Sequence, residues 1–144
     1  MKKFNWTKYL IAVIAVYVVY EILDFLIHGV ILMDKYESLG ETGLFGEDMD
    51  SNMWVIYITA FVFSIFFVYL FHYFVSAYKT GWMAGLYYGL VVGFLMLVSG
   101  VFNQYVVYGA PMDLIWQWFI FGVIQIAIAG VVAGLIYKPK AAAV

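Results

Sequence analysis

Four long apolar blocks, separated by three linkers, dominate the pattern of hydrophobic and polar positions along the chain. Each block exceeds the roughly 20 residues that a helix needs to cross the hydrocarbon of a bilayer at about 1.5 Å per residue. The blocks cover residues 9–33, 53–77, 81–104 and 114–137. This pattern predicts an all-α fold, an integral membrane four-helix bundle with antiparallel neighbours, in one domain over residues 1–144.

The three linkers differ in length and charge. The first, residues 34–52, is the longest and carries most of the acidic residues. In its segment 37–50 acidic residues are interleaved with glycine, so we expect a solvated, mobile connector there. The second, residues 78–80, is a tight connection. The third, residues 105–113, contains Pro111, which suits a turn before the start of the fourth helix.

Lysine placement predicts the orientation in the membrane. The positive-inside rule places both termini and linker 78–80 in the cytoplasm, because only Lys35 lies on the other side, among the acids of linker 34–52. The five tryptophans lie near the expected block ends, where an interfacial belt would hold them. We therefore expect a multi-pass protein of the inner (plasma) membrane whose linker 34–52 is extracytoplasmic. The lysines on the predicted cytoplasmic side are Lys2, Lys3, Lys8, Lys79, Lys138 and Lys140.

Composition narrows the function classes. Hydrophobic residues make up 67% of the chain and charged residues only 11%, which is too little charge to cover a soluble surface. Cysteine is absent from the sequence, which excludes disulfides, thiolate metal sites and covalently attached c-type haem. The sequence also lacks the Gly-x-Ser-x-Gly and His-Glu-x-x-His motifs of hydrolases. We expect the lipid bilayer as a partner, and we expect no nucleic acid, no cofactor and no enzymatic activity.

Glycines recur at four-residue spacing in the third block, and the fourth block carries a similar pair. Small residues at this spacing form a smooth stripe on a helix, where a neighbouring backbone can approach closely. Packing within the bundle is the first interpretation of the stripe, and contact between copies of the chain is the second. The predicted helix-packing glycines are Gly81, Gly85, Gly89, Gly93, Gly130 and Gly134.

Three ionisable residues lie inside the first block, where lipid should exclude them. Glu21, Asp24 and His28 are spaced three and four apart, so they share one face of a helix. A carboxylate facing hydrocarbon costs about 3 kcal/mol or more, so this face must point into the bundle or into a water-filled cavity. Counting the helical rise places Gln125 near the depth of Glu21 and three further polar residues near the depth of His28. These are Asn103, Gln104 and Gln117, which complete the candidate ligand- or ion-binding set.

This polar face is compatible with several kinds of chemistry. Carboxylates with an imidazole suit iron, manganese or zinc, but helical di-iron bundles need a Glu-x-x-His motif on two helices, which this chain lacks. A bis-histidine haem is disfavoured, because His28 and His72 should differ in depth by roughly 20 Å. Staggered carboxylates and a histidine can relay protons or cations. The remaining alternative is structural, with the acids neutral or hydrogen-bonded to Tyr, Gln and Asn partners.

Residues 24–29, Asp-Phe-Leu-Ile-His-Gly, carry an Asp-x-x-x-His-Gly motif, and Tyr36 follows it. Residues 85–90 and 129–137 extend the likeness into the third and fourth blocks. In these segments the chain resembles an uncharacterised family of small bacterial four-span membrane proteins. The resemblance implies a bacterial inner-membrane helix bundle and no particular reaction.

Two hypotheses for the function follow. The first is a non-enzymatic accessory or interaction subunit of a larger membrane complex, or a small homo-oligomer. It rests on the small size, the short cytoplasmic segments, the glycine stripe and the lack of catalytic motifs. The second is a protein that transports protons or cations, or binds a ligand or metal, through the polar face of the first helix.

Overall fold

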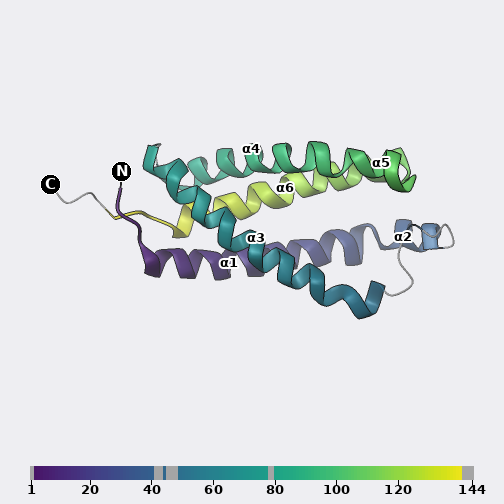
Figure 1. Ribbon diagram of the computed structural model, residues 1–144, viewed down its shortest axis with the longest axis horizontal. Coiled ribbons are helices and arrows are strands. Elements are labelled where there is room, and N and C mark those ends of the chain that lie inside the picture. Colours follow the sequence, from purple (N-terminus) through teal and green to yellow (C-terminus); the bar gives the residue numbers. More distant parts are fainter. Residues whose placement is uncertain (1, 41–43, 45–48, 78–79, 141–144) are drawn as a thin grey trace.

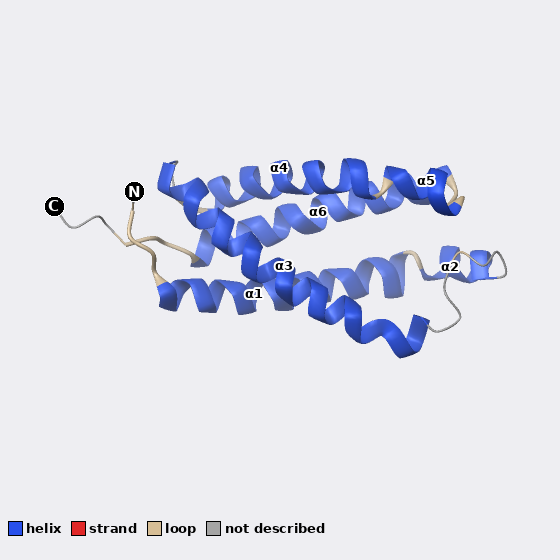
Figure 2. Ribbon diagram, in the orientation of Figure 1, coloured by secondary structure: helices blue, strands red, loops and turns tan. Residues whose placement is uncertain are grey.

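The structure, a computed structural model, describes residues 2–40, 44, 49–77 and 80–140. Helices account for almost all of this part of the chain, and it contains no named β-strand (Figure 2). The elements are α1 (Trp6–Leu26), the π-helix η1 (Ile27–Ile31), α2 (Met33–Leu39), α3 (Met49–Ala77), α4 (Trp82–Gly100), α5 (Phe102–Tyr108) and α6 (Met112–Ile136). The predicted all-α fold is confirmed.

Four helical segments are long and apolar enough to cross a membrane. They are Trp6–Ile31, Ser51–Ala77, Trp82–Tyr108 and Met112–Ile136. In the most apolar stretch of each segment, only 22% to 39% of the residues are buried inside the protein. Most of each segment therefore faces outward, and an apolar surface of this extent indicates contact with a lipid bilayer. The prediction of four membrane-length helices is confirmed.

The third membrane segment is longer than predicted, because α5 continues the path of α4. The polar residues Asn103 and Gln104 lie inside α5 instead of ending the segment. α5 ends at Tyr108 and is capped by Gly109, whose φ of 67° is in the left-handed region that glycine adopts readily. Pro111 then precedes the first residue of α6. The linker predicted at 105–113 is thus reduced to three residues between α5 and α6.

Part of the long acidic linker is folded. The expectation of a mobile connector at residues 37–50 is wrong at both ends, because residues 37–39 belong to α2 and residues 49–50 belong to α3. Tyr36 and Leu39 pack against the buried cluster around Leu114 of α6, so this short helix has an apolar partner surface. Residues 41–43 and 45–48 of this linker, and Lys79 of the second linker, lie outside the described residues.

The helices share a main hydrophobic core, which lies close to the first and last described residues of the chain. α4 and α6 make the most extensive contact in the bundle, and α1 contacts both α6 and α3. The main core forms where α1, α3, α4 and α6 converge, and Val16, Phe71, Ala129 and Tyr137 are fully buried in it. Figure 1 shows α3 crossing the other helices obliquely, with its C-terminal end beside the start of α4. α3 therefore joins the bundle mainly through its C-terminal half.

The glycine stripe of α4 packs against α6 of the same chain. A Cβ added to Gly85 would overlap the carbonyl oxygen of Gly130, and a Cβ on Gly89 would lie 2.5 Å from the carbonyl oxygen of Ile126. The two backbones approach this closely only because these positions lack side chains. The other glycines of this contact are Gly81, Gly93 and Gly134. A stripe filled by α6 is not available for contact between copies of the chain.

The two ends of the chain meet beside the main core. The backbone N–H of Lys3 donates to the carbonyl of Lys140 at 3.1 Å, and the N–H of Lys140 donates back at 3.0 Å. Asn5 Nδ2 also donates to the carbonyl of Lys138 at 3.1 Å. Both described ends therefore lie at the same end of the bundle (Figure 1).

Candidate functional site

A cleft of about 980 Å³ lies between α1, α2 and the N-terminal half of α3. It exists because α3 diverges from the bundle: every residue from 54 to 59 is exposed, and Ala60 is the first buried residue of α3 among the described side chains. The walls are mostly apolar. The apolar and aromatic side chains that define them are Ile22, Phe25, Met33, Met53, Ile56, Tyr57 and Trp118.

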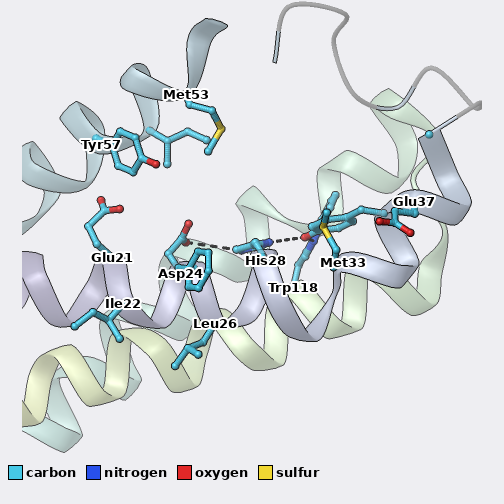
Figure 3. A pocket seen from close by; sticks show the side chains of 15 residues that line it. Glu21, Ile22, Asp24, Leu26, His28, Met33, Glu37, Met53, Tyr57 and Trp118 are labelled. Atoms are coloured by element: carbon cyan, nitrogen blue, oxygen red, sulfur yellow. Dashed lines mark hydrogen bonds and ion pairs between the residues drawn. The ribbon is translucent and has the colours of Figure 1, made fainter. Parts of the chain in front are cut away.

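One wall of the cleft is polar, and it comes from a single face of α1 and η1. Glu21, Asp24 and His28 all border the cleft, because spacings of three and four bring residues to the same side of a helix. Figure 3 shows these side chains extending from α1 toward the side on which α3 places Met53 and Tyr57. The face that was predicted to avoid lipid therefore borders a cleft between helices.

Gln125 of α6 makes hydrogen bonds to the part of α1 that carries the polar wall. Its side chain is only 4% exposed, and its Nε2 donates to the carbonyl of Tyr20 at 3.1 Å and to Asp24 Oδ1 at 3.3 Å. Glu21 differs, because its Oε1 is buried and has no hydrogen-bond partner among the described residues. The Asp24 carboxylate thus accepts a hydrogen bond from α6, whereas the Glu21 carboxylate has an oxygen that accepts none from the described residues.

A line of hydrogen-bonding groups connects α6 to Asp24 by way of α2. Trp118 Nε1 donates to the Tyr36 hydroxyl at 2.7 Å, and that hydroxyl is hydrogen-bonded to His28 Nδ1 (Figure 3). Burial raises the pKa of Tyr36 to about 12, so the phenol keeps its proton, and the tautomer of His28 decides which partner donates in the bond to Nδ1. His28 Nε2 lies 3.8 Å from Asp24 Oδ1. This line of side chains therefore runs from Trp118 to the carboxylate of Asp24.

α2 is held in place by a second connection to α6. Lys35 Nζ lies 2.5 Å from Asp113 Oδ2, and the two side chains form an ion pair. Together with the bond from Trp118 to Tyr36, this ion pair fixes the helix that forms the end wall of the cleft. The only lysine of linker 34–52 is therefore engaged with an acid outside the cleft.

The remaining predicted site residues do not border the cleft. Asn103 is exposed and Gln104 is half-buried, and both lie on α5. Gln117 lies on α6, where its Oε1 is buried without a hydrogen-bond partner in the described part of the chain. Equal depth in the membrane was the only argument that grouped these residues with His28, and depth does not determine which side of a helix a residue occupies.

The second histidine belongs to the main core. His72 is buried, its Nδ1 lies 2.7 Å from the hydroxyl of Tyr137, and the ring of Phe4 meets it edge-on. His28 lines the cleft and His72 does not, so the two imidazoles belong to separate sites. Within the described residues, no group of three or more His, Asp or Glu side chains is arranged to hold a metal ion.

Several residues that shape the cleft were not predicted from the sequence. Tyr36 lay in linker 34–52, just before the segment that was expected to be solvated, and Trp118 was assigned to the interfacial belt. A signal for Tyr36 was present, because Met33, Tyr36 and Leu39 recur at three-residue intervals, which is typical of a helix with one buried face. No comparable signal marks Tyr57, which borders the cleft only because α3 diverges.

The four membrane-length helices and their exposed apolar surface define a small multi-pass membrane protein of helical-bundle architecture. Within that class, the chain belongs to the family described as "Protein of unknown function (DUF1761)", whose sequence pattern matches residues 8–134. The match includes the whole polar wall of the cleft and the glycine contact between α4 and α6. Membership of an uncharacterised family is thereby confirmed. No curated protein and no solved structure matches the chain.

Proposed function

We propose that the chain is a non-enzymatic membrane protein that binds an amphipathic ligand in the cleft between α1 and α3. The observation that carries this proposal is the cleft itself, about 980 Å³ with Glu21, Asp24 and His28 on one wall and mainly apolar side chains elsewhere. Ligand sites are typically clefts of roughly 300–1,000 Å³ with apolar walls and a few convergent polar groups. A ligand with a polar head and an apolar body matches both walls. Acyl chains alone would leave carboxylates facing hydrocarbon, which is costly.

The surroundings of His28 support binding over catalysis. Its Nδ1 is hydrogen-bonded to Tyr36, and its Nε2 faces Asp24. A general acid or base must reach the proton that it transfers within hydrogen-bond distance. Because both ring nitrogens are directed at protein groups, we propose that His28 organises the polar wall and does not exchange protons with a bound molecule.

Native mass spectrometry of the protein purified in a mild detergent tests the proposed binding. We expect the wild-type chain to carry a bound small molecule and the cleft-filling variant Ile56→Trp to lose it. Leu95→Trp is the matched control, because Leu95 is 70% exposed on α4 and does not border the cleft. A wild-type chain that carries nothing, or equal retention in the two tryptophan variants, would refute the proposal.

We further propose that the protein lies in the inner (plasma) membrane of a bacterium with both termini in the cytoplasm. The lysine distribution supports this orientation, and the paired ends are compatible with it. Because the natural chain has no cysteine, single-cysteine variants report sidedness without background. A membrane-impermeant maleimide should label Ser38→Cys in intact cells and Lys3→Cys only after lysis. The opposite labelling pattern would invert the proposed topology.

A role as an interaction subunit is the second candidate function, and the exposure of residues 54–59 favours it. In that case a transmembrane helix of a partner protein packs along the N-terminal half of α3. A photo-crosslinking residue at Ile58 should capture a discrete protein that the same residue at Leu95 does not capture. Identical patterns from the two positions would contradict this role. A homo-oligomer would need a surface other than the glycine stripe, which α6 already fills.

A further inference from the structure

The charge of the cleft is unbalanced. Glu21, Asp24 and Glu37 border it, and none of its described lining residues is a lysine. Lys35, the one lysine of linker 34–52, is engaged with Asp113 outside the cleft. His28 does not balance the charge either, because even a protonated imidazole would offset only one of the three carboxylates. A cationic ligand is the complement of such a wall.

The hydrogen-bonding capacity of the same wall is also incomplete. Asp24 Oδ1 accepts from Gln125 and lies 3.8 Å from His28 Nε2, whereas Glu21 Oε1 has no donor among the described residues. A buried acceptor without a donor is costly, and most such groups in proteins are satisfied. A ligand group that brings a hydrogen to donate, beyond a positive charge, would match the unused acceptor capacity of Glu21.

The remaining walls indicate what is attached to that group. Phe25, Tyr57 and Trp118 present aromatic rings, and Ile22 and Ile56 present aliphatic side chains. Aromatic faces attract cations, and the aliphatic walls need an apolar counterpart. A bare metal ion or ammonium ion would leave most of the 980 Å³ unfilled.

We infer that the ligand of this cleft is a protonated amine with an apolar body, whose N–H donates to Glu21 while its charge faces Asp24. This inference rests on the proposed function, because it names the chemical class of the ligand that the cleft would bind. A quaternary ammonium carries the charge without an N–H, and a fatty alcohol carries a donor without the charge. Both should bind more weakly than a primary amine with the same tail.

Fluorine NMR of the chain labelled with 5-fluorotryptophan tests the inference in phosphatidylcholine nanodiscs. Trp118 borders the cleft, whereas Trp6 and Trp82 lie outside it and report non-specific effects of an added amphiphile. We expect dodecylamine to shift the Trp118 resonance saturably without shifting those of Trp6 and Trp82, two of the four other tryptophans. Dodecyltrimethylammonium and dodecanol should bind about tenfold or more weakly, because charged hydrogen bonds have at least that effect on affinity.

Removing one carboxylate at a time identifies the group that binds the amine. Glu21→Gln keeps the shape of the side chain and removes its charge, and it should weaken dodecylamine binding about tenfold or more. Asp34→Asn is the matched control, because it removes a carboxylate next to η1 that does not border the cleft. Unshifted Trp6 and Trp82 resonances in both variants would establish that the bundle still folds.

The outcomes separate this inference from the proposed function. If the three amphiphiles bind equally, or if Glu21→Gln binds dodecylamine as the wild type does, the amine is wrong and the ligand-binding cleft stands. If no amphiphile shifts Trp118 apart from Trp6 and Trp82, the proposed function fails as well. Replacing part of the phosphatidylcholine by phosphatidylethanolamine identifies the source of the ammonium group. Competition with dodecylamine indicates a lipid headgroup, and its absence indicates a free amine.

Discussion

Replacing Gly85 by alanine should push α4 and α6 apart at their closest approach. The added methyl group would overlap the carbonyl oxygen of Gly130 and lie 3.1 Å from the Cα of Gly134. Both are backbone atoms, so no side-chain rotation relieves the overlap. The two helices must therefore separate, or one must shift along the other.

The magnitude follows from the separation required. An ordinary contact is restored only after the backbones move apart by roughly 1 Å, and a gap of that size forfeits about a quarter to a half of the dispersion energy across the contact. Overpacking in a well-packed core costs about 1–3 kcal/mol, and we expect the upper end, about 3 kcal/mol, because the obstructing atoms are backbone. At Gly93 the nearest atom is a side-chain carbon of Ile126 at 3.2 Å, so alanine there should cost less than about 1 kcal/mol.

Unfolding in mixed micelles with an increasing fraction of sodium dodecyl sulfate, followed by tryptophan fluorescence, measures these differences. Gly100→Ala is the control, because nothing lies within 4 Å of a Cβ at the end of α4. The expected order of destabilisation is Gly85→Ala, then Gly93→Ala, then Gly100→Ala. If Gly85→Ala were as stable as Gly100→Ala, the close packing of α4 on α6 would be wrong.

Three further substitutions have expected outcomes in the same unfolding assay. Tyr88→Phe should cost about 1 kcal/mol, because the buried hydroxyl donates to the carbonyl of Phe67 at 2.8 Å; an unchanged midpoint would argue against that bond. Gly109→Ala should cost about 1 kcal/mol, because its φ of 67° disfavours a residue with a Cβ. A gain in stability would mean that the α5 cap is built differently. Tyr36→Phe should cost about 2 kcal/mol, because it leaves the Trp118 N–H and His28 Nδ1 without this partner; faster amide hydrogen exchange in α2 should accompany the loss, and unchanged exchange would contradict it.

The apolar blocks were sufficient to predict the membrane-length helices, because a bilayer sets a minimum length for an apolar segment and little else does. The spacing of Gly85 and Gly89 likewise predicted a close backbone contact, since only small residues permit it. The helical rise predicted Gln125 near the depth of Glu21. In the structure it reaches Asp24, one turn from the predicted level of Glu21.

The cleft itself could not be predicted, because it depends on the angle at which α3 crosses α1. That angle is set by packing around Phe67 and Phe71, which lie in the C-terminal half of α3, whereas Tyr57 and Met53 lie in its N-terminal half. The positions of Asn103 and Gln104 were missed for a related reason. α4 ends at Gly100 and α5 begins at Phe102, so the direction of side chains beyond the break does not follow from helical periodicity.

The pairing of Lys3 with Lys140 has a practical consequence for experiments on association. Two fragments of a split fluorescent reporter, fused to the two ends of one chain, would be brought together by folding alone. A signal from that fusion would report a completed bundle, and a destabilising change such as Gly85→Ala should reduce it. Association between chains would have to be measured with each fragment on a different copy, at a concentration where a folded single chain gives no background.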